Sequence, residues 1–441
     1  MSAGRRRIAG WGLALLAAAN AVVVVSLWGP GGIRDIHDTA GLLTGLGRVA
    51  GLLGAYVVLL QLLLLARLPV LDRLVGFDRL VAWHRVGGFA VLGLLGSHAV
   101  LITAGYTLGD RISVPDEVAR LITGYPGVIT AAAGLALLVA VAVTSAVAVR
   151  RRLRYETWYF IHLYAYLGVA LAFSHQLATG SDFVGEPAAR AYWYGLYGVT
   201  LGALVVFRLG VPVARTVRHR LRVARVVEEA PGVVSIVIAG VRLERLRART
   251  GQFFTWRFLT RDRWWEAHPF SLSAAPDGRR LRITVKGVGD YTDGLRAIPP
   301  GTPVIAEGPF GSFTTATRRR PRVALIAGGV GITPIRALLE DMPGGPGDIA
   351  VVYRAAREDE VILRAELDDL ASRRGAEIHY VVGDHRDGDF LTHEHLLRLV
   401  PDIASRDVYV CGPPAMTEAT RASLGRSGVP PRHIYTERFA F

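Results

Sequence analysis

Cysteine is almost absent from this chain, with Cys411 the single one among 441 residues. One cysteine excludes intramolecular disulfides, cysteine-ligated iron–sulfur clusters and haem attachment through a CxxCH motif. Acidic residues are in the minority, with 37 aspartates and glutamates against 51 lysines and arginines, for a formal net charge of +14. Such a balance is typical of nucleic-acid binding, or of basic loops gathered on one side of a membrane.

Apolar residues are abundant: 51% of the chain is hydrophobic and the mean hydropathy is +0.33. We expect six membrane spans, each long enough to cross a bilayer, at residues 8–28, 40–66, 80–104, 127–149, 157–178 and 191–213. The first has an apolar run too long for a signal peptide, and no obvious cleavage site precedes Trp28. The helical membrane bundle is expected to cover residues 1–214.

Arginines cluster before the first span, between spans two and three and between spans four and five, and after the sixth. By the positive-inside rule both chain ends are then cytoplasmic, in a multi-pass protein of the cytoplasmic (inner) membrane. Nucleic-acid binding is supported by the positive net charge alone, and this topology already accounts for that charge. No nucleic-acid partner is therefore expected.

Four histidines lie in the third and fifth predicted spans: His84 and His98, and His162 and His175. The spacings of 14 and 13 residues separate each pair by roughly 20 Å along a helix, and both spans run from inside to outside. The inner two therefore match in depth, as do the outer two. A lone membrane histidine is more often a hydrogen-bonded packing residue, but two depth-matched pairs favour axial ligation of two stacked haems.

One geometric tension accompanies that prediction. At 100° per residue, 14 steps return to within about 40° of the starting face, whereas 13 steps end about 140° away. The fifth span is therefore expected to tilt, bend or carry a local irregularity near Gly168.

Short strands broken by glycine and proline turns follow Val213 and predict a small antiparallel β-barrel domain at residues 215–318. From about Arg322 buried strands alternate with helical stretches, which predicts a Rossmann-like α/β domain with a parallel sheet at residues 319–441.

Two motifs suit a flat heterocycle and phosphate groups. His268-Pro269-Phe270-Ser271-Leu272-Ser273 places an aromatic ring and a hydroxyl beside an extended segment, where they can stack on and hydrogen-bond a flat heterocycle. Lys286-Gly287-Val288-Gly289-Asp290-Tyr291-Thr292 combines a cation, small residues and a hydroxyl suited to phosphates. The terminal Phe441 suggests a lid over a ring.

A glycine-rich turn, Gly328-Gly329-Val330-Gly331-Ile332-Thr333-Pro334, follows a predicted buried strand and precedes a helix. Such a turn lets backbone N–H groups approach a pyrophosphate, although it also occurs as a plain tight turn. Arg354 and Arg357 follow the next strand, where an arginine can hold the 2′-phosphate of NADPH. The acidic run 358–360 offers these arginines ion-pair partners instead, so NADPH is only weakly favoured over NADH.

With these motifs the chain resembles the transmembrane NADPH oxidase and ferric reductase superfamily over nearly its whole length, in the compact bacterial form without calcium-binding loops. The resemblance implies six helices that bind two b-type haems through the four histidines. It places Ser271 near flavin N5, Gly289 and Thr292 at the FAD pyrophosphate, and the loop 328–334 at the nicotinamide-nucleotide phosphates. It also places Cys411-Gly412-Pro413 beside the nicotinamide and Phe441 against the flavin.

The expected site residues are therefore of three kinds. The residues expected next to the reacting rings are Ser271, Cys411 and Phe441. Cofactor contacts are expected at His268, Pro269, Phe270, Ser271, Lys286, Gly289, Thr292, Gly328, Gly329, Gly331, Thr333, Pro334, Arg354, Arg357, Gly412, Pro413 and Phe441. The haem iron ligands are expected to be His84, His98, His162 and His175.

The expected function is electron transfer from cytosolic NAD(P)H through FAD and two haems to an acceptor across the lipid bilayer. Oxygen is slightly favoured because it needs little binding surface, and a ferric or cupric chelate is the alternative. The predicted outer loops carry acidic residues that could attract a metal cation: Asp35, Asp38, Asp110, Asp116, Glu117, Asp182 and Glu186. A membrane-anchored reductase that feeds a separate partner is a further alternative, although no obligate protein partner is inferred.

Overall fold

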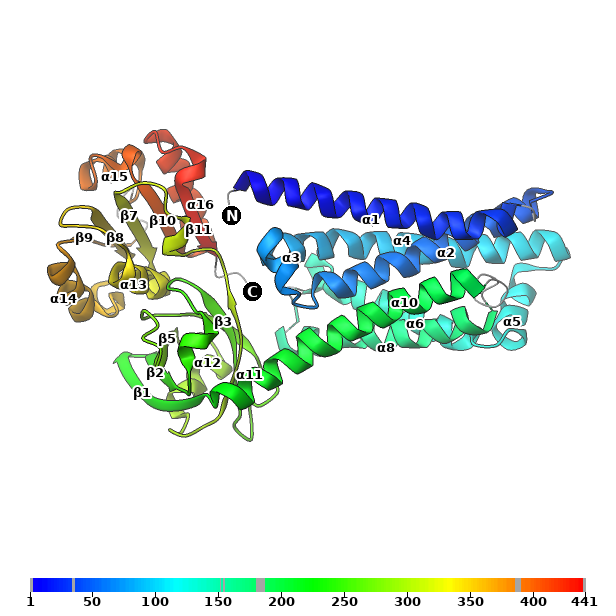
Figure 1. Cartoon of the computed structure of the whole chain (residues 1–441), viewed down its shortest axis with the longest axis horizontal. Helices are drawn as coiled ribbons and strands as arrows, with labels where there is room; N and C mark the ends of the chain where they lie inside the picture. Colours follow the sequence, from blue (N-terminus) through cyan, green and yellow to red (C-terminus); the bar gives the residue numbers. More distant parts are fainter. Residues whose placement is uncertain are drawn as a thin grey trace. The chain divides into compact units, whose positions relative to one another are not determined.

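The computed structural model describes residues 3–33, 36–150, 152–153, 155–179, 187–384 and 390–438. The chain divides into two compact units, Met1–Gly210 and Val211–Phe441, coloured from blue to green and from green to red in Figure 1. The first unit is helical, and the second combines sheets and helices.

The first unit consists of helices, many of them long. They are α1 (Ala3–Gly32), α2 (Thr39–Leu64), α3 (Pro69–Leu74), α4 (Phe77–Asp110), α5 (Val114–Gly124), α6 (Val128–Ser145), α7 (Val147–Arg150), α8 (Tyr155–Thr179), α10 (Pro187–Leu204) and the π-helical turn η2 (Val205–Gly210). Side-chain caps start two of them: Asp38 accepts a hydrogen bond from the Gly41 N–H at 2.7 Å before α2, and Ser113 precedes α5.

Five helices in the described part of the chain are long and apolar enough to cross a membrane. They cover Ile8–Trp28, Thr39–Leu64, Arg79–Asp110, Val128–Ser145 and Pro187–His219. Helix α8, the fifth predicted span, is not among them, because its two histidines and four tyrosines lower its hydropathy. A sixth crossing therefore stays a prediction.

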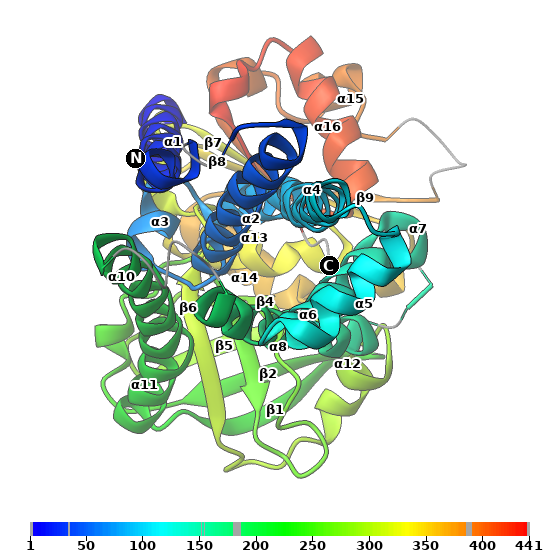
Figure 2. The ribbon, with the colours of Figure 1, turned by 90° about the vertical axis from the view of Figure 1, so that its right-hand side faces the viewer.

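Glycines bring the helices of this unit close together in pairs. Figure 2 views the unit nearly down its helix axes, with α2 beside α4 and α6 beside α8. A Cβ at Gly54 would lie 2.7 Å from Leu95 of α4, and one at Gly134 would lie 2.6 Å from the Gly168 carbonyl of α8. Small residues at such seams let helix backbones approach, which is how helices associate inside a membrane.

Helix α8 is an uninterrupted α-helix from Tyr155 to Thr179. The local irregularity expected near Gly168 is absent from this described helix, and Gly168 instead serves the close approach of α6. Helix α8 thus carries both histidines, 13 residues apart, without a break in the helix.

The second unit opens with α11 (Val211–His219) and two three-stranded antiparallel sheets. One sheet has the order β1 (Arg222–Ala230), β2 (Val233–Ala239), β5 (Arg280–Lys286), and the other β4 (His268–Ser271), β3 (Phe253–Phe258), β6 (Val304–Phe310). Single bridges join them, between Leu272 and Ile283 and between Arg222 and Pro303. The short helices here are η3 (Leu243–Leu246), α12 (Asp290–Gly294), η4 (Leu295–Ala297) and η5 (Thr315–Thr317).

The rest of the unit is a five-stranded, wholly parallel sheet, as the sequence predicted. Its order is β11 (Ile434–Arg438), β10 (Asp407–Gly412), β7 (Val323–Gly328), β8 (Ile349–Ala355), β9 (Glu377–Val382). The helices between the strands are η6 (Gly329–Gly331), α13 (Ile332–Asp341), η7 (Glu358–Glu360), α14 (Arg364–Arg374), α15 (His393–Leu399), η8 (Ile403–Ser405), α16 (Pro414–Arg426) and η9 (Pro431–His433).

Side chains alternate between the two faces of this parallel sheet. On β7, Leu325 joins the core formed with α13 and α14, while Ile326 joins the core formed with α15 and α16. Because both faces are covered by helices, the strands read as continuous apolar runs. The loops at the carboxyl ends of the strands, where ligands bind in such sheets, carry the glycine-rich turn.

Candidate functional site

The four membrane histidines meet in two pairs, one residue of each pair from α4 and one from α8. The ring centres of His84 and His162 are 5.9 Å apart, and those of His98 and His175 are 6.3 Å apart. With metal–nitrogen bonds of about 2 Å and roughly 1 Å from each nitrogen to its ring centre, a bis-imidazole metal holds the rings about 6 Å apart. Both pairs therefore have the separation that one iron between two imidazoles requires.

The His98 ring is oriented by α2. Its Nδ1 lies 2.8 Å from the Gly47 carbonyl oxygen, and because a carbonyl only accepts, Nδ1 carries the proton and donates it. Nε2 is then left with its lone pair available, which is the state of a ligating imidazole. One turn along α2, a Cβ at Gly51 would lie 2.6 Å from Nδ1 of His98, so the ring fits only beside glycine. Neither glycine was predicted from the sequence, although the Gly47-x-x-x-Gly51 spacing is typical of close helix packing.

The other pair is less completely supported. His162 Nδ1 lies 3.3 Å from the Ser145 hydroxyl, which also accepts a hydrogen bond from the Trp158 indole N–H at 3.1 Å. Nδ1 of His84 is buried beside the backbone of Gln61 on α2. It lacks the well-formed hydrogen bond that orients His98.

The predicted flavin motif forms strand β4 and the residues after it. The His268 ring stacks on Tyr291 with centres 3.8 Å apart, and Phe270 lies beyond His268 at 6.5 Å. Pro269 faces Thr255 of β3 in the sheet register. The Ser271 hydroxyl is buried and has no hydrogen-bond partner in the part of the chain that the structure describes. It could therefore donate a hydrogen bond to a ring nitrogen of a bound heterocycle.

The predicted phosphate residues of this motif are placed around α12. Thr292 donates its hydroxyl proton to the Gly289 carbonyl at 3.0 Å and accepts a hydrogen bond from the Val288 N–H at 2.8 Å. Both partners of the hydroxyl are thus backbone groups of the loop just before it. A Cβ at Gly289 would meet nothing within 4 Å. Lys286 reaches Glu360 at 3.8 Å. Gly289 and Thr292 thus lie in one loop, while the Lys286 ammonium group is directed toward Glu360 in the part of the unit that contains the parallel sheet.

The glycine-rich turn and the Cys411-Gly412-Pro413 segment come together at the carboxyl ends of β7 and β10. A Cβ at Gly331 would lie 2.3 Å from the Cys411 carbonyl oxygen, and one at Gly412 would lie 3.2 Å from the Gly328 backbone. Gly329 has φ of +52°, a backbone conformation that favours glycine. The close approach of two backbones thus requires Gly331 and Gly412, and the positive φ favours glycine at position 329.

Side chains around this turn are engaged in the fold. The Thr333 hydroxyl donates to the Val330 carbonyl at 3.0 Å, and Pro334 stands in the first turn of α13. Pro413 precedes α16. Cys411 is fully buried, and burial, helped by Glu437, raises the pKa of its thiol well above its usual value. Its thiol is therefore a small apolar core group, and its backbone lines the glycine turn.

The two arginines predicted near the nucleotide differ in their surroundings. Arg354 donates to the Val381 carbonyl at 3.3 Å and its guanidinium lies 4.1 Å from the centre of the Phe390 ring. Arg357 is exposed and pairs with Asp359 at 3.0 Å, the alternative that the acidic run offered. Phe441, the predicted flavin lid, lies outside the described residues.

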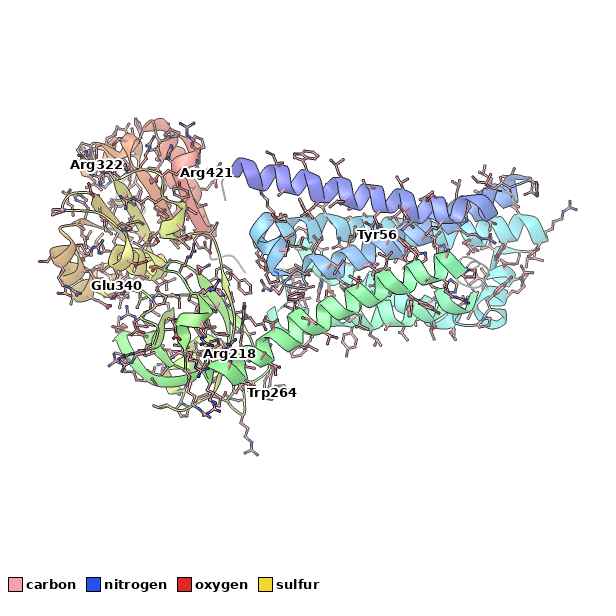
Figure 3. All side chains as sticks on the ribbon, in the orientation of Figure 1. Tyr56, Arg218, Trp264, Arg322, Glu340 and Arg421 are labelled. Atoms are coloured by element: carbon pink, nitrogen blue, oxygen red, sulfur yellow. The ribbon has the colours of Figure 1, made fainter. Side chains whose placement is uncertain are left out.

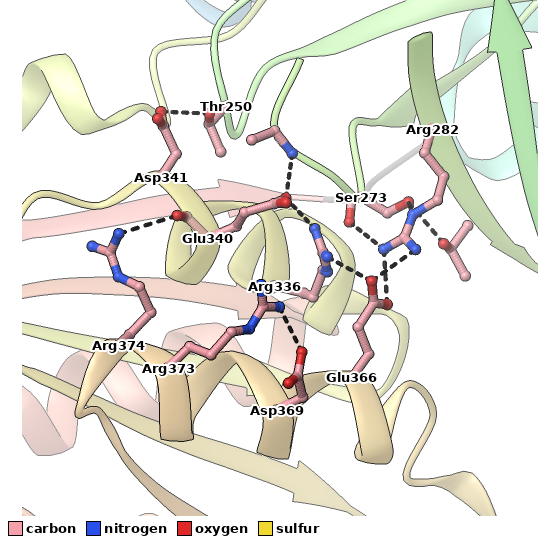
Figure 4. A network of polar contacts seen from close by, with 12 residues as sticks. Thr250, Ser273, Arg282, Arg336, Glu340, Asp341, Glu366, Asp369, Arg373 and Arg374 are labelled. Carbon is pink, nitrogen blue, oxygen red and sulfur yellow. Dashed lines mark hydrogen bonds and ion pairs between the residues drawn. The ribbon is translucent and has the colours of Figure 1, made fainter. Parts of the chain in front are cut away.

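A network of charges that the sequence analysis missed joins the two parts of the second unit (Figure 4). Arg282 of β5 donates two hydrogen bonds to Glu366 of α14, both at 3.0 Å. Arg336 of α13, whose side chain is 5% exposed, pairs with the same carboxylate at 2.5 Å and with Glu340. Glu340 also accepts the Ala275 N–H at 2.7 Å. The spacing of Arg336 and Glu340 was visible in the sequence, but the partners from other elements were not.

Two families match different stretches of the chain. Residues 50–173 match the family described as "Ferric reductase like transmembrane component", and residues 325–422 match "Oxidoreductase NAD-binding domain".

The similar proteins cover a third to a half of this chain. NADH-cytochrome b5 reductase 1 of Cryptococcus neoformans is 27% identical over 165 residues, which cover 33% of this chain and 56% of that protein. The ferredoxin reductase component of the 3-ketosteroid-9-alpha-monooxygenase of Mycolicibacterium smegmatis is 30% identical over 232 residues, covering 50% and 65%. The alignments thus span little more than half the length of these relatives. Among solved structures, the flavohem-like FAD/NAD binding domain of the Vibrio cholerae nitric oxide dioxygenase is 23% identical with a TM-score of 0.42, covering 50% of this chain and 98% of that one.

The chain therefore contains a stretch that matches an oxidoreductase NAD-binding domain family. It joins a ferric-reductase-like transmembrane domain to an FAD/NAD-binding module of the ferredoxin-reductase type.

Proposed function

We propose that this protein moves electrons across a membrane, from NAD(P)H through FAD and two b-type haems to an acceptor on the far side. The observation that carries the proposal is the facing of His84 with His162 and of His98 with His175, at ring separations suited to one iron each. FAD supplies the change from a two-electron hydride donor to single electrons, and haem iron carries them one at a time.

The remaining roles are proposed from the family resemblance together with the geometry of the described residues. Ser271, with its unpartnered hydroxyl, would face flavin N5, and the flavin ring would lie along β4. Gly289 and Thr292 would border the pyrophosphate of FAD, and the loop 328–334 that of the nicotinamide nucleotide. Phe441 would cover the flavin.

The finer architecture belongs to the same proposal. Helix α8 is the sixth crossing, since it carries half of the histidine ligands and packs along α6. The bridges Leu272–Ile283 and Arg222–Pro303 support closure of the two small sheets into a barrel. The proposed domains remain 1–214, 215–318 and 319–441, with both chain ends and both soluble domains in the cytoplasm.

Oxygen is the proposed acceptor. The acidic residues that could attract a metal cation have other partners where the structure describes them. Arg120 lies 2.8 Å from Glu117 and also pairs with Asp110, while Asp116 accepts from the Ser113 hydroxyl at 2.6 Å. Asp35, Asp182 and Glu186 lie outside the described residues. A ferric or cupric chelate remains the alternative acceptor, as does a separate partner protein fed by the reductase.

An absorption spectrum of the detergent-purified, FAD-supplied chain tests this proposal, recorded without oxygen before and after NADPH. Oxygen is then admitted in the presence of a superoxide trap. Reduced b-type bands that appear with NADPH and disappear as superoxide is trapped would support the oxidase. Bands that persist in oxygen and disappear with a ferric chelate would indicate a metal reductase. Complete absence of haem bands would overturn the assignment of the histidines.

His98→Ala tests the order of the electron path. Because this residue is assigned to the outer haem, we expect the variant to lose reduction of the external acceptor while NAD(P)H still reduces FAD. Stopped-flow absorbance separates the two steps. His37→Ala is the matched control, because His37 is an exposed residue before α2. Acceptor reduction at the unaltered rate in His98→Ala would refute the path.

NADPH is the proposed hydride donor. NADPH is weakly favoured by Arg354 and Arg357, yet Arg357 is ion-paired with Asp359. NADH is therefore kept as the alternative donor.

A further inference from the structure

Helix α11 buries His219 and half-buries Arg215, while its exposed face carries the apolar side chains of Val213 and Val217. Arg215 donates to the Gly308 carbonyl, and His219 hydrogen-bonds the Val241 carbonyl at 3.0 Å. Val213 and Val217, one turn apart, are 59% and 68% exposed. A surface helix in water shows the reverse pattern, whereas a helix that lies in a membrane interface turns its apolar face to the lipid.

The position of α11 in the chain brings it to the membrane surface. It forms the end of the last candidate span, Pro187–His219, which has 33 residues. At 1.5 Å per residue this span is about 50 Å long, against a hydrocarbon core of about 30 Å. The span is therefore about 20 Å longer than the hydrocarbon core, and most of α11 lies past residue 213, where the sixth predicted span ends.

A second apolar feature is carried by the turn between β3 and β4. Trp264 and Trp265 are 56% and 37% exposed, with ring centres 5.8 Å apart and ring planes at 86°. The turn is anchored by Arg263, which donates to the Gly294 carbonyl at 2.9 Å and accepts the Glu266 N–H at 3.0 Å. The two indoles thus project from a fixed turn.

The end of α11 and the start of this turn meet at the same point of the sheet. The Val304 N–H donates to the Leu221 carbonyl, just after α11, and the Leu259 N–H donates to the Pro303 carbonyl, just before the turn, both at 2.9 Å. Figure 3 labels Arg218 of α11 and Trp264 on this part of the unit.

The charges of the two features are predominantly positive. Arg218, Arg220 and Arg261 are exposed, and Asp262 pairs with Arg263 at 3.1 Å. Arginines beside tryptophans are the combination that binds the interface of an anionic bilayer, with the indoles at the headgroup level.

We propose that Val213, Val217, Trp264 and Trp265 form a lipid-docking surface that seats the second unit on anionic phospholipid headgroups. The valines and indoles enter the interface, and the neighbouring arginines meet the lipid phosphates. This surface fixes one side of the reductase unit against the bilayer, independently of which electron acceptor is used.

Site-specific labelling of the full chain in lipid nanodiscs tests the proposal. Because Cys411 is fully buried, a cysteine introduced by W264C or by V217C takes up a fluorescent maleimide selectively. The control is R322C, on an exposed side chain next to the parallel sheet. Quenching by lipids that carry a spin label at the headgroup is expected to be at least about twofold stronger at the two test positions.

The same measurement also tests the dependence on anionic lipid and distinguishes lipid from a second protein chain on this surface. Quenching at residues 217 and 264 is expected to be stronger in nanodiscs with phosphatidylglycerol than in phosphatidylcholine alone. Quenching equal to that of R322C would overturn the proposal. Shielding of the probes without lipid quenching, together with a doubled particle mass, would assign the surface to a second copy of this chain and would overturn it as well.

Discussion

At the scale of single residues, the histidine site depends on groups that carry no reactive chemistry. Gly47 supplies a carbonyl that fixes the proton of His98, and Gly51 leaves the space that the ring occupies. A ligand's second nitrogen usually has such a partner, and the partner sets which nitrogen can bind a metal.

Gly51→Ala is therefore expected to displace the His98 ring, because the new Cβ would stand 2.6 Å from Nδ1. Overpacking of this kind costs about 1–3 kcal/mol. The variant should lose about half of the bound haem, which a pyridine haemochrome assay measures per chain. Gly88→Ala is the control, since a Cβ there meets nothing within 4 Å; equal haem content in both variants would contradict the assignment.

Ser271→Ala is expected to separate stability from function. The Ser271 hydroxyl is buried without a partner in the described structure, so its removal should change the free energy of unfolding by less than about 1 kcal/mol. If it donates to flavin N5, the rate of FAD reduction by NAD(P)H should fall about tenfold. Stopped-flow absorbance and thermal unfolding measure the two effects.

Ser235→Ala is the comparison for that prediction. Its hydroxyl is hydrogen-bonded to Thr284 at 2.7 Å, so the variant should lose about 1 kcal/mol of stability and keep the rate of FAD reduction. If NAD(P)H reduces FAD in Ser271→Ala at the same rate as in the unaltered chain, the proposed contact between Ser271 and flavin N5 is wrong.

At the scale of elements, the second unit is held together by a charged seam between β5, α13 and α14. Glu366 receives both Arg282 and Arg336, so three elements that are distant in sequence share one carboxylate. Buried charges are favourable only while each is paired, because loss of one partner leaves the other without compensation.

Arg336→Gln is accordingly expected to lower the free energy of unfolding by about 2 kcal/mol, because it removes charge-assisted hydrogen bonds while Glu366 keeps its pair with Arg282. For a unit of this size that corresponds to a fall in Tm of about 6 °C, read from tryptophan fluorescence during heating. Arg373→Gln on α14 is the matched control, because its pair with Asp369 is 63% and 60% exposed and is worth about 0.5 kcal/mol. Equal Tm values for the two variants would count against the buried seam.

At the scale of the whole molecule, the arginine distribution predicts which ends of the helices face the cytoplasm. The bounds of α5 place it between the third and fourth predicted spans, and the arginine distribution predicts that this segment is on the outer side. The second unit follows the last predicted span and is predicted to lie on the cytoplasmic side.

Cysteine labelling of intact cells tests this topology. We expect A119C, on exposed α5, to react with a membrane-impermeant maleimide added from outside, because α5 is on the predicted outer side. R421C, on exposed α16, should react only after the membrane is opened. The unaltered chain is the control, since its single cysteine is buried. Reaction of R421C in sealed cells would reverse the predicted orientation.

The sequence by itself determined the features that depend on neighbours along the chain. Helix length follows from apolar runs, as in α2 and α4, and the parallel sheet follows from buried strands that alternate with helices. The depth match of the four histidines and the position of the glycine-rich turn after β7 are also local, because they need only residue spacing and the direction of each span.

Only the tertiary structure decided which residues from different elements meet. It brought Gly47 and Gly51 to His98, placed Glu366 between two arginines, and turned the apolar side of α11 outward. It also met the 13-residue histidine spacing with an unbroken α8. The physical reason is that such contacts depend on how helices and sheets pack, and one sequence pattern is compatible with many packings until the core fixes one.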